Sequence, residues 1–337
     1  MRTRNLSIAA GVAAGIAATM LRRYRSPMSF RNQTAFVTGG SRGLGLLLAR
    51  ELASRGANVA ISARDGDELR RAEEQIRSDG GRVLSIEADM TIREEVESAV
   101  RKIEDEFGEV EVLVNNAGTI AVGPQETMTI DDYRSSINTH FWGPYFTTMA
   151  VLPQMQRKKA GRIVNVSSIG GKISVPHLLP YSVGKFALTG FSEGLRSELL
   201  KDGVYVTTVC PGLMRTGSPR NALFKGNNEA EYAWFSISDA LPVLSLNANR
   251  AARRVIDACA RGDAEIILTL PAQVATIIHG LFPDLTVDML GVINRLLPGP
   301  GGIGSDVRTG QQSRSNASPS WATTLNERAA AANNQIA

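Results

Sequence analysis

The sequence predicts an α/β protein built on a doubly wound parallel sheet of about seven strands. Short apolar, β-branched stretches alternate with helix-like stretches about every 20–30 residues, which is the pattern of repeated strand–helix–strand units. The first such strand, at 35–37, runs into a glycine-rich turn and then a helix. Polar or glycine-rich motifs also follow the later strands, and ligands of such sheets bind at the carboxyl ends of strands.

The remaining elements follow from the same periodicity. Strands are expected at 35–37, 57–64, 83–90, 110–118, 161–168, 204–216 and 264–270, and helices at 67–80, 91–107, 131–152 and 272–297, the last broken at Pro283. Residues 217–245 are expected to form a substrate lid or a surface helical pair. The predicted organisation is a leader at 1–27, a catalytic domain at 28–270, a helical extension at 271–298 and a disordered tail at 299–337.

Charge and cysteine content exclude several classes of protein. The net charge is +4, but residues 1–25 contain five arginines and no acid, so the rest of the chain carries 32 basic and 33 acidic residues. The body is therefore not a basic nucleic-acid-binding domain. Cys210 and Cys259 lie in apolar stretches and are expected to be buried free thiols rather than a disulfide. The three histidines lack metal-ligand spacing, so no metal is expected.

An uncharged apolar stretch, residues 6–21, lies between arginine pairs. Sixteen helical residues span about 24 Å, which is short of the roughly 30 Å hydrocarbon core of a bilayer. A membrane anchor, a signal peptide and a disordered leader are the three interpretations. If the stretch inserts, the arginines that follow it place the catalytic domain on the cytoplasmic face.

The turn T-G-G-S-R-G-L-G (38–45) predicts a dinucleotide site, because a strand here feeds a helix whose first N–H groups can hold a pyrophosphate. Gly39 allows the tight turn, Gly43 the close approach of the cofactor, and Gly45 close packing of helix on strand. Arg64 lies at the end of the second strand, at a position where NAD-specific sites have a carboxylate. Arg42, in the glycine-rich loop, could reach the same position. Two guanidinium groups favour NADP(H) over NAD(H), although Asp65 follows directly.

The stretch 168–185 predicts an acid–base site. Tyr181 and Lys185 lie one helical turn apart, and the lysine charge is expected to lower the pKa of the phenol. Ser168 ends the preceding strand. Asp89 ends the third strand and is expected to bond the adenine amino group.

Together these motifs resemble the short-chain dehydrogenase/reductase family over about residues 30–270, with N-N-A-G (115–118), Asn138, Y-S-V-G-K (181–185) and a Pro-Gly pair in family order. The resemblance implies a Rossmann-type sheet and an NAD(P)-dependent oxidoreductase that interconverts a carbonyl and a secondary alcohol. The implied catalytic residues are Asn138, Ser168, Tyr181 and Lys185. The implied cofactor-binding residues are Thr38, Gly39, Ser41, Arg42, Gly43, Leu44, Gly45, Arg64, Asp89, Asn116, Ala117, Gly118, Tyr181, Lys185, Pro211, Gly212 and Thr216.

Each catalytic residue takes a role from the resemblance. Tyr181 exchanges a proton with the substrate oxygen, Lys185 lowers the pKa of Tyr181 and binds the nicotinamide ribose, and Ser168 donates a hydrogen bond to the substrate oxygen. Asn138 holds a water that links Lys185 to solvent. The apolar residues of 224–297 favour an apolar substrate, and the family implies a dimer or tetramer. The alternative function is a non-catalytic NADP(H)-binding sensor or scaffold at a membrane.

Overall fold

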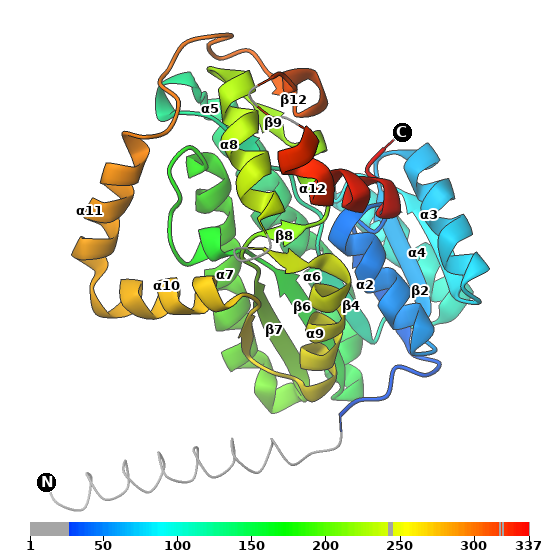
Figure 1. Cartoon of the computed structure of the whole chain (residues 1–337). Helices are drawn as coiled ribbons and strands as arrows, with labels where there is room; N and C mark the ends of the chain where they lie inside the picture. The colour runs from blue at the N-terminus through cyan, green and yellow to red at the C-terminus, as the bar shows by residue number, and fades with distance from the viewer. Residues whose placement is uncertain (1–26, 242–244, 317, 319, 337) are drawn as a thin grey trace, which may run out of the picture.

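The computed structural model describes residues 27–241, 245–316, 318 and 320–336. Its centre is a seven-stranded sheet in the order β11-β7-β6-β4-β1-β2-β3, with every neighbouring pair parallel (Figure 1). The predicted fold class is therefore confirmed. The strands are β1 (Thr34–Thr38), β2 (Asn58–Ala63), β3 (Arg82–Glu87), β4 (Val112–Asn115), β6 (Gly161–Val166), β7 (Val204–Cys210) and β11 (Glu265–Ile267).

Helices cover both faces of the sheet. The helices are α2 (Gly43–Ser54), α3 (Gly66–Ser78), α4 (Arg93–Phe107), α5 (Ile130–Ile137), α6 (Gly143–Lys158), α7 (Leu179–Leu199), α8 (Asn228–Ala240) and α9 (Ala248–Arg261). Alternate residues of β1 point to opposite faces, so Val37 packs with α2, α3 and α9 while Phe36 packs with α4 and α6. Because both faces are buried, β1 is apolar along most of its length rather than alternating.

The strand order reverses at β1, which pairs with β2 on one side and with β4 on the other. In a doubly wound sheet the loops diverge at such a reversal and leave room for a ligand at the carboxyl edge. A small sheet of β5 (Ala121–Val122), β9 (Leu223–Phe224) and β12 (Arg308–Thr309) lies beyond that edge. The region 217–245 contributes β9 and α8 to this part of the molecule.

The stretch predicted as a disordered tail, 299–337, instead contains β12, the turn η6 (Gln311–Ser313) and helix α12 (Ser320–Ala332) within its described residues. Helix α12 packs against α8, where the Asn326 side chain donates to the Ser236 carbonyl at 3.1 Å (Figure 1). Its Ala-rich composition resembled a linker, but small side chains also allow close helix packing. The order comes from tertiary contacts that composition does not reveal.

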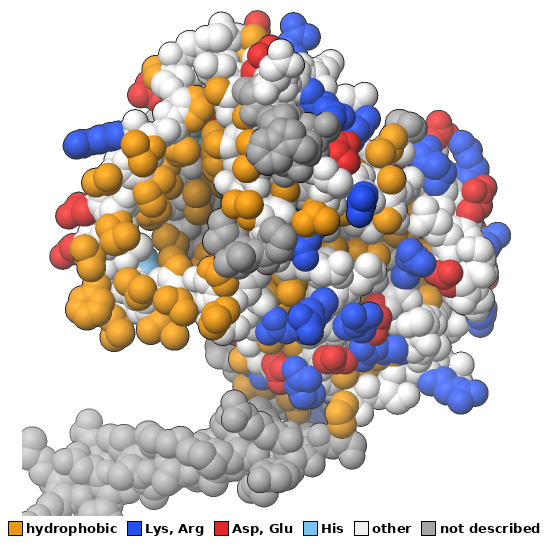
Figure 2. Space-filling view, viewed as in Figure 1, with side chains coloured by type: hydrophobic (Ala, Val, Ile, Leu, Met, Phe, Trp, Pro, Cys, Tyr) orange, Lys and Arg blue, Asp and Glu red, His pale blue; other side chains and the backbone are white. Residues whose placement is uncertain are grey.

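The predicted break at Pro283 separates helices α10 (Leu270–Leu281) and α11 (Pro283–Asn294). No residue of α11 is buried, and large apolar side chains of both helices are exposed, including Leu281 on α10 and Leu285 on α11. Figure 2 shows these side chains as a hydrophobic area over the two helices. Within the described ranges no helix combines the length and apolar character needed to cross a bilayer. The apolar leader stretch 6–21 lies outside the described residues.

Candidate active site

The three residues of the expected acid–base site meet at the carboxyl edge of β6. Ser168 caps the turn η3 (Ile169–Gly171), and its hydroxyl oxygen accepts a hydrogen bond from the Gly170 N–H at 3.0 Å. A Cβ atom placed on Gly170 would lie 3.2 Å from the Tyr181 ring and 3.5 Å from the Ser168 hydroxyl oxygen. The serine hydroxyl and the tyrosine ring therefore border the same glycine, as the sequence spacing predicted.

Lys185 follows one turn later on α7 and is 4% exposed. Its ammonium group donates to the Val166 carbonyl at 2.8 Å and lies 5.7 Å from the centroid of the Tyr181 ring. The end of β6 thus fixes the lysine side chain, while the helix fixes its distance from the phenol.

Burial, rather than charge, dominates the protonation of this pair. Burial raises the pKa of Tyr181 to about 12, although a hydrogen bond with Ser168 opposes the change. Burial also lowers the pKa of Lys185 to about 7. Burial of the phenol therefore acts against the lowering of the Tyr181 pKa that was expected from Lys185, and that effect of Lys185 stays a prediction.

One residue that sequence reasoning missed stands beside this pair. Helices α5 and α6 are joined by a π-helical turn, η2 (Asn138–Trp142), and His140 on this turn is 1% exposed. Its ring lies edge-on to Tyr181, with ring centroids 5.2 Å apart. Asn138 begins the same turn and is exposed, and its side chain makes no hydrogen bond to the residues that the structure describes. A π turn shifts which residues face inward, and this shift is not visible in a sequence read with ordinary helical spacing.

The glycine-rich loop has the geometry that a dinucleotide needs. Gly39 and Gly43 have φ values of +63° and +57°, in the left-handed region that favours glycine. A Cβ on Gly45 would lie 2.0 Å from the Gly39 carbonyl oxygen, so only glycine allows α2 to pack this closely. Leu44 lies between them in the first turn of α2. The tight turn at Gly39 and the close helix packing at Gly45 are therefore as predicted, while close approach of a cofactor at Gly43 stays a prediction.

The Asn-Asn-Ala-Gly loop after β4 is tied to the glycine-rich loop. The Thr38 hydroxyl oxygen accepts from the Asn116 and Ala117 N–H groups at 3.0 and 3.1 Å, and the Asn116 amide donates to the Thr38 and Gly39 carbonyls at 3.1 Å. Gly118 packs against the His140 ring. The two predicted cofactor loops therefore form one hydrogen-bonded unit.

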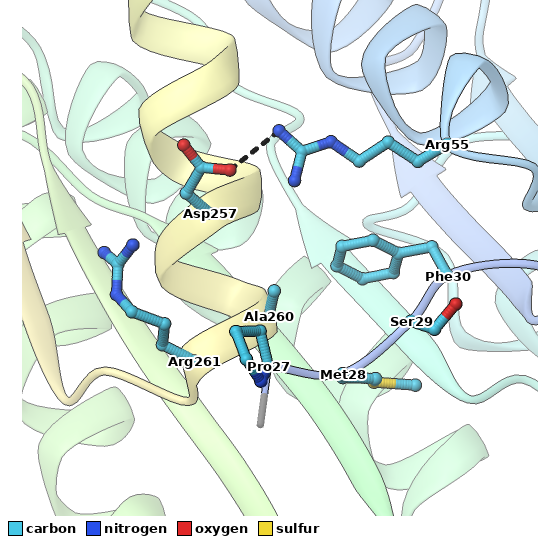
Figure 3. Close-up of a pocket in the computed structure, with 8 residues that line it drawn as sticks. All are labelled: Pro27, Met28, Ser29, Phe30, Arg55, Asp257, Ala260 and Arg261. Carbon is cyan, nitrogen blue, oxygen red and sulfur yellow. Dashed lines mark ion pairs between the residues drawn. The ribbon is translucent and has the colours of Figure 1, made fainter. Parts of the chain in front are cut away.

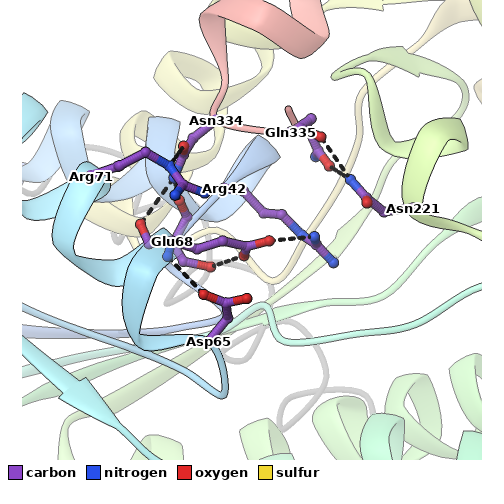
Figure 4. Close-up of polar contacts among 8 residues, drawn as sticks. Arg42, Asp65, Glu68, Arg71, Asn221, Asn334 and Gln335 are labelled. Atoms are coloured by element: carbon purple, nitrogen blue, oxygen red, sulfur yellow. Dashed lines mark hydrogen bonds and ion pairs between the residues drawn. The ribbon is translucent and has the colours of Figure 1, made fainter. Parts of the chain in front are cut away.

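Of the two arginines predicted to bind a phosphate, Arg42 is ion-paired (Figure 4) and Arg64 is largely exposed. Arg42 pairs with Glu68 of α3 at 2.7 Å, and the same carboxylate accepts from the Ser41 hydroxyl at 3.0 Å. The Arg64 side chain is 70% exposed, with Asp89 3.9 Å away. Asp65 caps α3 by accepting from the Glu68 N–H at 2.8 Å. One oxygen of its carboxylate therefore caps the helix, and the choice between NADP and NAD stays a prediction.

The remaining predicted cofactor residues lie after β3 and β7. Asp89 accepts from the backbone and the hydroxyl of Thr91 at 2.8 Å. The Pro211 carbonyl accepts from the Ile169 N–H at 2.8 Å, so the end of β7 holds the loop that carries Ser168. Gly212 and Thr216 continue this segment, and Thr216 is buried.

A buried carboxylate joins α8 to the loop before Tyr181. Glu231 is fully buried and accepts hydrogen bonds from the His177 imidazole at 2.7 Å and the Trp234 indole at 2.6 Å. His177 has a φ of +61°, which is unusual for a side chain of this size. The Glu231 side chain therefore connects helix α8, in the region expected to form a lid or a surface helical pair, to the loop before Tyr181.

A pocket of about 280 Å³ lies elsewhere, at the amino end of the sheet (Figure 3). Residues 27–30 and the end of α9 line it, and the ion pair between Arg55 and Asp257, at 2.8 Å, borders it. The catalytic side chains stand at the opposite, carboxyl edge, so this pocket is not part of the active site.

Fold and site together define a class of protein: a dinucleotide-dependent oxidoreductase with a doubly wound sheet. The family model described as short chain dehydrogenase matches residues 33–223, and the chain belongs to this family. It is 33% identical over 254 residues to Putative oxidoreductase SadH of Mycobacterium tuberculosis, covering 74% of this chain and 91% of that protein. It is 35% identical over 197 residues to Granaticin polyketide synthase putative ketoacyl reductase 1 of Streptomyces violaceoruber, covering 57% and 71%.

Among solved structures, the chain is similar to a metagenomic short-chain oxidoreductase in complex with NADP. The TM-score is 0.58 at 29% identity, over 72% of this chain and 98% of the other. The protein is therefore an NAD(P)-dependent dehydrogenase or reductase.

Proposed function

We propose that the protein interconverts a ketone and a secondary alcohol on an apolar substrate with NADP(H) as cofactor. The observation that carries the proposal is the convergence of Ser168, Tyr181 and Lys185 at the carboxyl edge of β6, beside the two joined cofactor loops. A nicotinamide cofactor, when bound, supplies or accepts the hydride. The loop 38–45 and residues 116–118 would hold it, with Asp89 at its adenine and Pro211, Gly212 and Thr216 at its carboxamide.

The side chains of the chain manage the proton and the substrate oxygen. In reduction, Tyr181 gives its hydroxyl proton to the carbonyl oxygen, and in oxidation it takes that proton back. The Ser168 hydroxyl accepts from the Gly170 N–H and also hydrogen-bonds Tyr181. A substrate oxygen that takes the place of the tyrosine oxygen in this bond would receive the serine hydrogen. The Lys185 ammonium group lies 5.7 Å from the centroid of the Tyr181 ring, so its positive charge would favour the tyrosinate form.

The surroundings of Tyr181 support an apolar substrate. Its ring packs against a buried cluster that includes Leu178, Phe224 and Phe235, with Trp234 at the border. The buried polar groups at its border, Glu231 and His177, are bonded to each other, so recognition would rest on apolar contact and on one substrate oxygen held by Ser168 and Tyr181. The name of the ketoacyl reductase relative agrees with a carbonyl substrate.

The test is NADPH oxidation with a panel of apolar ketones and quinones. We expect Tyr181→Phe to lower kcat/KM on the order of a thousandfold, while Tyr133→Phe on the surface of α5 serves as the matched control. Activity that survives Tyr181→Phe would contradict the assigned acid. NADPH binding without turnover of any carbonyl would favour the sensor function instead.

We also propose membrane contact and self-association as properties of the full chain. The leader stretch 6–21 and the exposed apolar side chains of α10 and α11 support contact with a bilayer from the cytoplasmic side. Trp142, Val183 and Phe186 are exposed near or on α7, which supports pairing of copies through this face. Co-sedimentation with liposomes and light scattering of the purified chain test the two properties separately.

A further inference from the structure

His140 carries a buried hydrogen-bond acceptor that has no donor. Its Nε2 atom lies 2.9 Å from the Thr119 carbonyl oxygen. Because a carbonyl oxygen only accepts, Nε2 carries the ring hydrogen and Nδ1 presents a lone pair. No group in the described part of the chain donates to Nδ1. A buried acceptor without a donor destabilises the fold, so its retention calls for a water or a functional partner.

Glycines make room for this imidazole on two sides. A Cβ on Gly118 would lie 2.9 Å from the ring Cε1 and 3.3 Å from Nδ1, and a Cβ on Gly184 would lie 3.1 Å from the His140 Cβ. Gly118 belongs to the loop after β4, and Gly184 stands directly before Lys185. Burial and the nearby Lys185 charge hold the pKa of His140 well below its usual value, so the ring stays neutral and Nδ1 remains an acceptor.

We propose that His140 Nδ1 positions a water molecule beside Lys185, and that this water returns the proton that Tyr181 gives to the substrate. The inference rests on the proposed function and gives His140 the role that the family resemblance assigned to Asn138. Tyr181 passes its proton to the carbonyl oxygen, the ammonium group of Lys185 reprotonates the phenolate, and the water replaces the lysine proton from solvent. The Lys185 ammonium makes one hydrogen bond to the described residues, to Val166, which leaves two N–H groups for this path.

Two substitutions separate this role from a structural one. The amide of His140→Asn lies near the position of Nδ1 and keeps the acceptor. The amide of His140→Gln lies near Nε2 and keeps the bond to Thr119. We expect His140→Asn to retain kcat within about threefold and the wild-type pH profile, and His140→Gln to lose about 10–100-fold and to shift that profile. The opposite order would show that the Thr119 bond is what matters, and would overturn the inference.

The same series tests Asn138. His140→Gln should change the pH profile more than Asn138→Ala does, and the reverse ranking would return the proton path to Asn138. NADPH binding by fluorescence and the melting temperature of each variant confirm that the site is folded. An active Tyr181→Phe variant would refute the proposed function itself. If Tyr181→Phe is inactive but His140→Gln is fully active, only the role of His140 is refuted.

Residues 333–335 form a short segment, the strap, near the carboxyl end of the described chain. They are at most 7% exposed and lie across the glycine-rich loop (Figure 4). The Gly43 N–H donates to the Asn333 carbonyl at 2.8 Å, and the Asn334 amide donates to the Ser41 and Glu68 carbonyls at 2.8 and 2.9 Å. Gln335 accepts from the Asn221 amide at 2.6 Å on the other side of the site.

The strap covers the face of the loop that a phosphate would approach. The side-chain nitrogen of Gln335 lies 2.6 Å from where a Cβ on Gly43 would stand. Because glycine has no side chain, a pyrophosphate could approach the backbone closely at Gly43. The Gly43 N–H is also one of the donors at the start of α2 that could bind it. The geometry points to an autoinhibitory strap: residues 333–335 occupy the phosphate face and leave it when the dinucleotide binds. This inference rests on the proposed cofactor.

Binding of NADPH to the purified full chain tests the strap. A chain ending at Ala332 should bind NADPH about 5–20-fold more tightly, and Asn334→Asp, which loses the two donated bonds, should change affinity in the same direction. Hydrogen exchange at 41–46 should rise in both variants. The exposed neighbour Ile336→Ala is the matched control. Weaker or unchanged binding in the shortened chain would overturn the inference. If the full-length, strap-free and control chains all fail to bind any dinucleotide, the proposed cofactor fails instead.

Discussion

Glu68 and Arg42 form an ion pair at 2.7 Å across the mouth of the proposed 2′-phosphate site. The Glu68 side chain is 16% exposed and also accepts a hydrogen bond from the Ser41 hydroxyl. One carboxylate thus binds both groups, the Arg42 guanidinium and the Ser41 hydroxyl, that are proposed to bind a phosphate. A dianionic phosphate that bound Arg42 would have to compete with this carboxylate, because the two carry like charges. We therefore expect Glu68 to weaken, and Arg42 to strengthen, the binding of a phosphate here.

Glu68→Gln should raise the preference for NADPH over NADH by about three- to tenfold. The substitution removes the negative charge but keeps the size of the side chain. Dissociation constants for both cofactors, from fluorescence titration, give the ratio. Glu74→Gln on the exposed side of α3 is the matched control. An unchanged ratio in Glu68→Gln would mean that the phosphate does not approach Arg42.

Arg64→Ala should weaken NADPH much more than NADH. The side chain is 70% exposed and its nearest carboxylate, on Asp89, is 3.9 Å away, so its charge remains available to a phosphate. We expect a loss of about tenfold for NADPH and less than twofold for NADH, consistent with one charge-assisted hydrogen bond. Arg70→Ala, an exposed arginine on α3, controls for the general change in charge. Equal losses for the two cofactors would remove Arg64 from the phosphate site.

The sequence predicted the parts of the site whose contacts are local. Tyr181 and Lys185 share one helix, and Gly39 to Gly45 form one turn, so their spacing alone fixes their geometry. The direction of the Tyr181 pKa was not predictable in this way, because burial by distant elements outweighs the nearby charge.

Other parts of the site depend on contacts between residues that are far apart in the sequence or on an irregular helical turn, and the spacing of residues does not predict these. His140 faces Tyr181 because of a π turn, which moves the inward-facing position away from Asn138. Asn334 reaches Ser41 across nearly the whole length of the chain, and its Asn/Ala-rich surroundings look like those of a disordered segment. Such features become visible only when the fold brings distant residues together.

Glu231→Gln should loosen α8 from the catalytic loop. The carboxylate accepts hydrogen bonds from both His177 and Trp234. The glutamine amide has one oxygen that can accept from one of them, but its NH₂ group would face the N–H of the other. We expect a loss of about 2–3 kcal/mol in stability, since a buried donor is left unsatisfied. KM for apolar ketones should rise by more than kcat falls, because the helix borders the apolar cluster rather than the reacting atoms.

Two measurements check this role of Glu231. The emission of Trp234 should shift when its indole loses the carboxylate, and steady-state kinetics separate KM from kcat. Glu229→Gln in the exposed first turn of α8 is the matched control. An unaltered KM in a destabilised Glu231→Gln protein would show that this connection supports folding alone.

Asp239 makes stability depend on pH in a direction that can be worked out. It lies on α8, is 5% exposed, and accepts from the Met214 N–H at 3.1 Å. Burial raises the pKa of its carboxyl from 3.8 to about 7, and hydrogen bonds from Met214 and Asn326 only partly oppose this. The folded state thus binds one more proton than the unfolded state between about pH 4 and pH 7. Stability therefore falls as pH rises through this window, and the full cost is present above pH 7.

Asp239→Asn should remove this cost, because the amide is neutral at every pH and still accepts from Met214. We expect a stabilisation of about 2–4 kcal/mol at pH 8 that shrinks towards zero near pH 4, which corresponds to about 3–6 °C in Tm at pH 8. Thermal unfolding of wild type, Asp239→Asn and the exposed control Asp105→Asn across pH 4–8 measures the slope. A gain in Tm that is the same at every pH would show that Asp239 does not titrate in this range.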